Sequence, residues 1–303
     1  MNQTANNIIT IQNSSVGGHQ LLAVETTGEE KAATNSEISH EPTLYAEPVF
    51  SIGSFQVTNS LLNSWVVVVL LVIFSLVLRK KIKRIPRGLQ NAVEIVIEGA
   101  LNMVDSVTSD RKKSQKVFPF VFAIFVFILL NNWLGLIPGI GSIGFLESEA
   151  GHQVFIPLLR GGTADLNTTL ALAIFAVISS NIFGILMVGV WKHFNKFVNL
   201  KALVQIPQRI TKEPAIVIVN PIKFFVGIIE IIGEIAKVAS LSFRLFGNIF
   251  AGEVLLASMA ALFAFVLPVP FMFLEVIVGL IQALIFAMLT LVYYTIASTA
   301  EEH

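Results

Sequence analysis

The chain has 303 residues, of which 54% are hydrophobic and 13% are charged, and its mean hydropathy is +0.77. Soluble domains usually carry about 25% charged residues, so this composition excludes a compact soluble protein and predicts a membrane protein. The 20 basic and 20 acidic residues cancel to a net charge of +0, which argues against a nucleic-acid-binding protein because that class needs a basic surface. The absence of cysteine excludes disulfides, thiolate metal sites and a cysteine nucleophile.

The chain divides into two units by composition. Residues 1–44 are rich in Asn, Thr, Ser, Glu and Gly, and we expect them to form a polar, mobile tail outside the membrane. They lack the charged start and the apolar stretch of roughly 7–15 residues that a secretory signal requires. Residues 45–303 are expected to form one polytopic membrane domain, in which residues 45–60 make an ordered turn that leads into the first span.

The first predicted span, Leu61–Leu78, fixes the orientation. Six basic residues follow it between Arg79 and Arg87, and under the positive-inside rule such a run lies in the cytoplasm. The N-terminus is therefore expected outside. Residues 89–107 place polar side chains at helical spacing between apolar ones, which is typical of an amphipathic helix lying in the membrane interface.

Two further spans follow, at about Val117–Ile137 and Leu170–Trp191. The loop 139–166 between them is expected outside, and the basic residues after the third span return the chain to the cytoplasm.

The last third of the chain is predicted to form two long helices. The first runs from about Pro221 to Leu267, which at 1.5 Å per residue is about 70 Å, whereas the hydrocarbon core is about 30 Å thick. This helix must tilt steeply, bend or lie nearly flat. Residues 267–270 turn the chain, and a second helix, Phe271–Ala297, runs back. The predicted fold is an all-α integral membrane protein with upright spans, an interfacial amphipathic helix and a long, strongly tilted C-terminal helical hairpin. Five crossings place the C-terminus in the cytoplasm.

Ionisable residues inside a membrane are costly and mark functional sites. At 100° per residue, a polar stripe of the first long helix, made of Glu230, Lys237, Arg244 and Asn248, lies within about 40° of Arg244. The small residues Gly233, Ser240 and Gly247 join that stripe. Small residues let another helix approach this face closely. Structural pairing between helices remains an alternative for Glu230, Glu234 and Lys237.

The second long helix repeats this pattern, since Glu275, Gln282 and Tyr293 share a face. Glu253 points away from Arg244 on a helical wheel, so the two are not expected to form a salt bridge. Arginine does not release its proton in proteins, so Arg244 is predicted to act as a fixed positive charge. The carboxyl groups are predicted to take up and release protons.

The run Ser-Leu-Ser-Phe-Arg-Leu-Phe-Gly-Asn-Ile-Phe-Ala-Gly-Glu from Ser240 to Glu253 resembles the signature of subunit a of the F-type ATP synthase membrane sector. The run 282–293, the segments 133–138 and 163–167, and the Glu-Glu-His ending are similar too. The resemblance covers about residues 45–303 and is silent on residues 1–44.

The resemblance implies a non-catalytic proton-channel subunit on the stator of a rotary ATP synthase. Two half-channels would lead to the carboxylates of a ring of c subunits, and Arg244 would face that ring and separate them. The implied outer pathway contains Glu253, Glu275, Gln282, Asn248 and Asp165. The implied inner pathway contains Glu230, Lys237 and Ser240. The order of proton transfer between Glu253 and Glu275 stays open.

The implied partners are the c-subunit ring, the b-subunit peripheral stalk, other ATP synthase subunits and membrane lipid, without nucleic acid. The implied location is a bacterial inner membrane. No cofactor, metal site or nucleotide site is expected in this chain. It has no G-x-x-x-x-G-K-[ST] motif, and Gly139–Gly144 fits G-x-G-x-x-G but lacks the preceding strand and βαβ context of a dinucleotide site.

Two other function classes fit the sequence less well. A self-contained ion-coupled secondary transporter often shows repeated halves, and residues 61–137 do not repeat in 170–297. An intramembrane hydrolase needs a nucleophile paired with a base, and none is evident.

Overall fold

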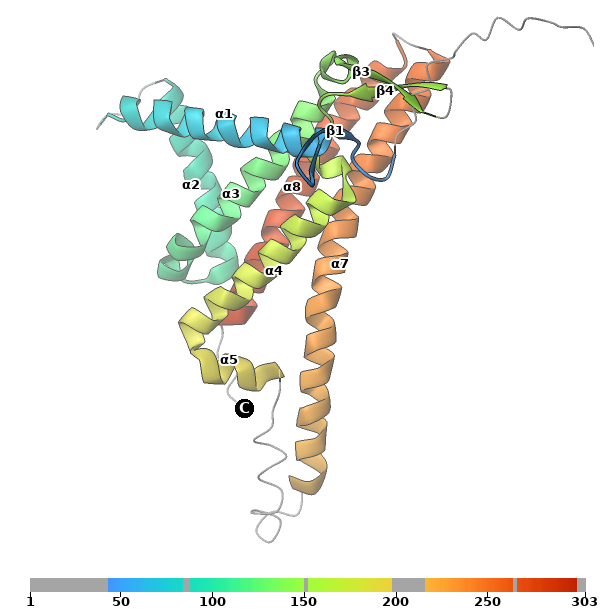
Figure 1. The fold of residues 1–303 in the computed structure, drawn as a ribbon. Coiled ribbons are helices and arrows are strands. Elements are labelled where there is room, and N and C mark those ends of the chain that lie inside the picture. Colours follow the sequence, from blue (N-terminus) through green and yellow to red (C-terminus); the bar gives the residue numbers. More distant parts are fainter. Residues whose placement is uncertain (1–42, 84–87, 150–151, 198–215, 264–265, 299–303) are drawn as a thin grey trace, which may run out of the picture.

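The computed structural model describes residues 43–83, 88–149, 152–197, 216–263 and 266–298. The expected tail 1–44 lies almost wholly outside these ranges, as do four residues of the basic run (84–87), the cytoplasmic loop 198–215 and the Glu-Glu-His ending. The described part is a helical assembly with two short β-hairpins (Figure 1).

Five of the described helices are long and apolar enough to cross a membrane. They are α1 (Asn59–Lys81), α3 (Arg111–Leu136), α4 (Leu166–Val188), α7 (Ile216–Leu262) and α8 (Pro268–Ser298). Helix α2 (Leu89–Thr108) is not one of them, because its polar residues recur through its length. The predicted all-α membrane fold is confirmed.

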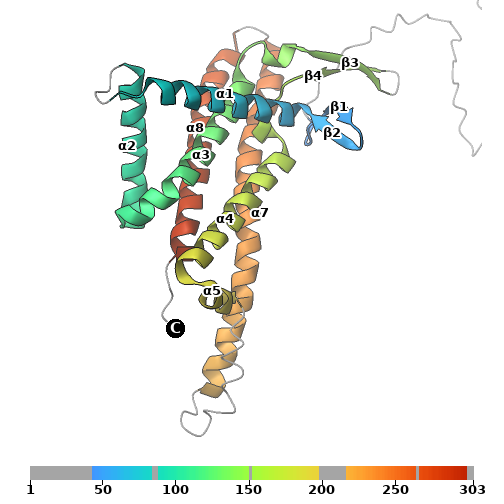
Figure 2. The same cartoon turned by 60° about the vertical axis from the view of Figure 1, so that its left-hand side comes forward.

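The helices cross one another steeply, which explains how a 47-residue helix fits this fold. In both views α1 runs across the long axis of α7, and α2 runs across α1 (Figures 1 and 2). When α1 stands upright in the bilayer, α7 is strongly tilted and α2 lies near the membrane plane. This arrangement agrees with the predicted interfacial helix and tilted hairpin.

Capping residues set several helix starts that apolar periodicity alone misplaces. Helix α4 begins four residues before the predicted Leu170 because the Asp165 side chain caps it, accepting from the backbone N–H of Asn167 at 3.1 Å. It ends at Val188, where Gly189 adopts a left-handed φ of 95°, and the chain continues as the short helix α5 (Val190–Phe197). Trp191, placed at the end of the third span by its sequence, therefore lies on α5.

The two long C-terminal helices have different bounds from those predicted. Helix α7 starts at Ile216, five residues before Pro221, and ends at Leu262 rather than Leu267. Helix α8 starts at Pro268 itself. Proline is tolerated in the first helical turn because its missing N–H has no intrahelical partner there. The turn expected at 267–270 is therefore partly helix.

Two hairpins lie at one end of the molecule, near the start of α1 (Figure 2). Strands β1 (Pro48–Ile52) and β2 (Phe55–Thr58) pair antiparallel, and so do β3 (Gly144–Glu149) and β4 (His152–Pro157). The first hairpin occupies the expected turn at 45–60, and the second lies in the loop 139–166 as a structure that the sequence did not predict. The 3₁₀ turn Ile140–Ser142 leads into strand β3, which is not the strand–turn–helix context of a dinucleotide site.

Helix α8 joins two apolar clusters and so lies at the centre of the packing. The larger cluster brings together side chains of α3, α4, α7 and α8, including Ile128, Leu241 and Phe286. The smaller one packs α2 and α3 against the later part of α8 around Leu291 and Tyr294. Helix α7 contributes one face to the larger cluster, which leaves its opposite face open.

Candidate functional site

Arg244 lies on a face of α7 that the described elements leave exposed. Its Nη2 donates to Oγ of Ser240 at 3.2 Å, and Nδ2 of Asn248 donates to the carbonyl oxygen of Arg244 at 3.0 Å. A Cβ atom added at Gly233 or Gly247 would meet nothing within 4 Å. The part of the predicted stripe from Ser240 to Asn248 is thus an exposed surface of small and polar side chains that carries the guanidinium of Arg244, whereas Glu230 and Lys237 at its other end are half-buried.

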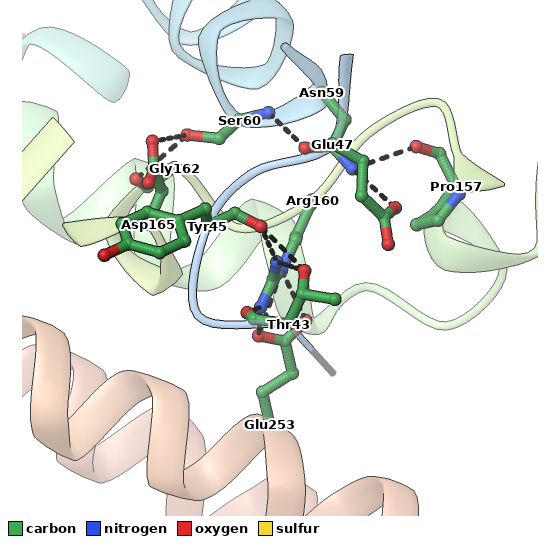
Figure 3. Close-up of polar contacts among 10 residues, drawn as sticks. All are labelled: Thr43, Tyr45, Glu47, Asn59, Ser60, Pro157, Arg160, Gly162, Asp165 and Glu253. Carbon is green, nitrogen blue, oxygen red and sulfur yellow. Dashed lines mark hydrogen bonds and ion pairs between the residues drawn. The ribbon is translucent and has the colours of Figure 1, made fainter. Parts of the chain in front are cut away.

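Glu253 pairs with Arg160 rather than with Arg244, in agreement with the helical-wheel expectation (Figure 3). Arg160 follows strand β4, and its guanidinium points at the Glu253 carboxylate on α7. Nε donates to Oε1 at 2.9 Å and Nη2 donates to Oε2 at 2.8 Å, which is a bidentate geometry. The Arg160 residue is only 6% exposed.

The Arg160 guanidinium also binds the N-terminal segment, residues 43–47. Nη2 donates to the carbonyl oxygen of Thr43 at 2.7 Å, and Nη1 donates to the carbonyl oxygen of Tyr45 and to Oγ1 of Thr43, both at 3.2 Å. Glu47 on the same segment accepts from the Asn59 side chain at 3.4 Å, and Asn59 also donates to the carbonyl oxygen of Pro157 at 3.3 Å. The segment is therefore fixed against both α1 and the second hairpin (Figure 3).

Glu275 lies beside Glu253 in a cavity of about 200 Å³. Residues of α3, α7, α8 and the Gly161–Ala164 turn line this cavity, and the two glutamates are its titratable side chains. Glu275 is 6% exposed, and its Oε1 atom is buried without a hydrogen-bond partner among the described residues. Gln282, two turns along α8, is half-buried.

Asp165 lies near this cavity but faces α1. Its Oδ1 caps α4, and its Oδ2 accepts from the Thr168 hydroxyl at 3.2 Å and the Ser60 hydroxyl at 3.4 Å (Figure 3). Ser60 also donates to the carbonyl oxygen of Gly162 at 3.3 Å. This geometry gives Asp165 a structural task, which is to fix the start of α4 and the turn that lines the cavity.

Two neighbouring asparagines connect α3 to the helices around it. Oδ1 of Asn131 accepts from Nδ2 of Asn63 and from Oγ of Ser64, each at 3.2 Å. Asn132 donates to the carbonyl oxygen of Gly279 on α8 at 2.9 Å and accepts from the Thr163 hydroxyl. These buried amides connect α3 to α1 and α8, and Asn132 also lines the cavity.

A second polar cluster lies before Arg244 on α7, on the side toward α5. Lys237 Nζ donates to Glu234 Oε1 at 2.6 Å and lies 5.2 Å from the centroid of the Tyr293 ring. Glu234 Oε2 accepts from Nδ2 of Asn181 at 3.0 Å, and the Asn181 Oδ1 lies 3.1 Å from Nε2 of the buried His193 on α5. Lys237 was singled out from the sequence, whereas Asn181 and His193 were not. Glu230 is half-buried one turn before Glu234.

Of the site residues missed by sequence reasoning, Arg160 had a readable signal. It is the one basic residue between Gly139 and Leu166, in a loop that the positive-inside rule leaves poor in Lys and Arg. Its pairing with Glu253 spans 93 positions, so no local pattern connects the two. His193 was assigned to a cytoplasmic loop because it follows the third span directly.

The comparisons with known proteins agree on one family. The model of the family described as ATP synthase A chain matches residues 61–295. The ATP synthase subunit a of Geobacter sulfurreducens is 34% identical over 235 residues, which cover 78% of this chain and 85% of that protein. The ATP synthase subunit a of Syntrophobacter fumaroxidans is 33% identical over 252 residues, covering 82% and 87%. That of Moorella thermoacetica is 29% identical over 245 residues, covering 81% and 93%.

Proposed function

This chain belongs to the ATP synthase subunit a family, and from that premise we propose that it provides two half-channels to the carboxylates of a c-subunit ring, separated by Arg244. It is a multi-pass, non-catalytic membrane subunit that serves proton transport in ATP synthesis, and its partners are other subunits of the ATP synthase. The observation that carries the proposal is the position of Arg244, exposed on a face of α7 that no described element covers.

The open face of α7 suits a rotating partner. Gly233, Ser240 and Gly247 keep it shallow, so a neighbouring helix can approach closely. A guanidinium stays protonated throughout, so Arg244 attracts an ionised ring carboxylate as it passes and blocks direct proton flow between the two half-channels. Asn248, bonded to the Arg244 carbonyl oxygen, extends this polar surface toward the cavity.

The outer half-channel is proposed to enter through the cavity that holds Glu253 and Glu275. These carboxyls come from α7 and α8, and the cavity that joins them is lined by residues of four parts of the fold. Gln282 continues the path along α8. Asp165 acts at this end by fixing the turn that forms one wall of the cavity.

The inner half-channel is proposed to run along α7 from Ser240 past Lys237 to Glu230. The Glu234, Asn181 and His193 cluster lies beside it and adds polar groups that lead toward α5. Each proton that crosses releases about 2.3 kcal/mol per 100 mV of membrane potential, and separate access from the two sides converts that energy into rotation.

Charge supports the proposed orientation. The basic residues after α1 favour the cytoplasmic side for that end, so the N-terminus is proposed outside the cell and the C-terminus in the cytoplasm. The proposed location is a bacterial inner membrane. Residues 1–44 are proposed as an outer tail and 45–303 as the membrane domain. The b-subunit peripheral stalk is proposed as the partner that holds the chain against the ring.

The test is Arg244→Ala in the complete ATP synthase, reconstituted into vesicles. Loss of proton-driven ATP synthesis is expected, with Arg111→Ala as the matched control because Arg111 lies at the start of α3 in an exposed ion pair with Asp105. Near-normal ATP synthesis by the Arg244 variant would refute the role of Arg244. Ion transport by the purified chain alone would instead favour the secondary transporter.

A further inference from the structure

The Arg160 guanidinium binds two parts of the chain beside the cavity of Glu253 and Glu275. One is Glu253 on α7 and the other is segment 43–47. Arginine carries five N–H donors in a planar fork. Here they are directed at the two oxygens of Glu253, the carbonyl oxygens of Thr43 and Tyr45, and the Thr43 hydroxyl (Figure 3). A buried guanidinium with every donor used is fixed in one orientation.

The two glutamates of the cavity have opposite surroundings. Glu253 is bound in bidentate geometry by a permanent cation, which occupies both of its carboxylate oxygens. Glu275 has one oxygen buried without a partner among the described residues, and its carboxyl lies against Gly252. Among the described residues, the charged groups at this cavity are Glu253 on α7 and Arg160, which binds Glu253. The neighbouring parts of α3 and of the Gly161–Ala164 turn contribute uncharged residues to the cavity lining.

We propose that Arg160 is a positioning residue of the outer half-channel, which holds Glu253 as a fixed anion, fastens segment 43–47 beside it, and leaves Glu275 as the carboxyl that exchanges protons. This inference rests on the proposed function and deepens it. A proton from outside water forms an O–H bond at Glu275. That bond breaks when the proton passes on toward a ring carboxylate, and Glu275 returns to its ionised form. Glu253 keeps its ion pair with Arg160 throughout.

The geometry also explains why the position holds arginine rather than lysine. A lysine ammonium is a point charge on a flexible stem and lacks the planar fork. It would still reach one carboxylate but would not bind Glu253, Thr43 and Tyr45 together. Arg160→Lys therefore separates the two tasks, because it keeps the cation and loosens segment 43–47.

The experiment uses the complete ATP synthase in vesicles and measures proton-driven ATP synthesis while the pH on the N-terminal side is varied. Arg160→Gln removes the cation that binds Glu253 and lets its carboxyl exchange protons together with Glu275, so the pH profile of ATP synthesis is expected to shift. Adding Arg160→Gln to Glu253→Gln is expected to give no further shift, because Arg160 acts through Glu253. Arg160→Lys is expected to keep the profile of the parent enzyme.

The glutamate variants test the division of roles. Glu275→Gln is expected to lower the rate about tenfold more than Glu253→Gln does, since loss of a positioned acid–base group costs about 10²–10⁴-fold. An unshifted profile for Arg160→Gln, an equal shift in the Glu253→Gln background, or a larger loss for Glu253→Gln would each overturn the proposal. If Arg160→Gln does not assemble, the comparison of the two glutamate variants and the Arg160→Lys profile still decide. Arg244→Ala tests the proposed function separately, so failure of one is distinguishable from failure of the other.

Discussion

The carboxyl group of Glu275 fills the space beside Gly252 that a Cβ atom would need. A methyl group added at Gly252 would collide with all three heavy atoms of that carboxyl. Gly252 lies on α7 and Glu275 on α8, so the absence of a side chain at one position is what lets the other enter between the helices. Small residues at helix contacts allow this close approach.

Gly252→Ala is therefore expected to move the Glu275 carboxyl out of the cavity while leaving α7 helical. Proton-driven ATP synthesis should fall by about 10- to 100-fold, since displacing a working group by about 1 Å has effects of that size. The matched control is Gly99→Ala in α2, where an added Cβ meets nothing within 4 Å. Unchanged synthesis by the Gly252 variant would show that the position of Glu275 is not critical.

The spans could be predicted because each contains a long apolar run, and α2 could be told apart by its recurring polar residues. The polar stripe around Arg244 was also readable, because it depends only on helical periodicity within one helix. What the sequence did not supply are contacts between distant segments. The Arg160–Glu253 pair and the contact of Gly252 with Glu275 are set by how the helices pack, and no local pattern encodes either of them.

Helix boundaries shifted where one residue outweighs the apolar pattern. Asp165 starts α4 four residues early, and Pro268 begins α8 inside the expected turn. Asp165, expected in the outer pathway from family resemblance, caps α4 and also accepts from the Ser60 and Thr168 hydroxyls. Its carboxylate is occupied by backbone and hydroxyl donors.

Asp165→Ala is expected to destabilise the start of α4 by about 1 kcal/mol, the usual cost of losing a helix cap. Asp165→Asn keeps an oxygen that can cap the helix, so most of that stability should remain. Thermal unfolding of the purified complex measures the difference between the two variants. Equal losses for both variants would mean that the negative charge of Asp165 matters rather than its capping oxygen.

Asn131→Leu is expected to weaken the contact between α1 and α3. It removes the acceptor for Asn63 and Ser64, and interhelical hydrogen bonds in membranes are worth about 0.6 kcal/mol each on average. The expected loss is about 1 kcal/mol, measured as resistance of the complex to denaturation. Asn91→Leu on the exposed face of α2 makes the same chemical change without a buried contact, and an equal effect there would contradict the assignment.

The last prediction concerns the ion pair of Glu234 and Lys237. Removal of Lys237 alone leaves Glu234 without its cation, whereas removal of both charges does not. Lys237→Met removes the cation that binds Glu234 at 2.6 Å and lies over Tyr293, and a lost hydrogen bond to a charged group costs about 1.5–3 kcal/mol. The double variant Lys237→Met, Glu234→Gln removes the uncompensated charge, while Gln can still accept from Asn181. Its stability is expected to recover toward that of the parent chain. A double variant less stable than Lys237→Met alone would show that Glu234 is stabilised more by another partner than by Lys237. His193, which contacts Glu234 through Asn181, would then be the next residue to substitute.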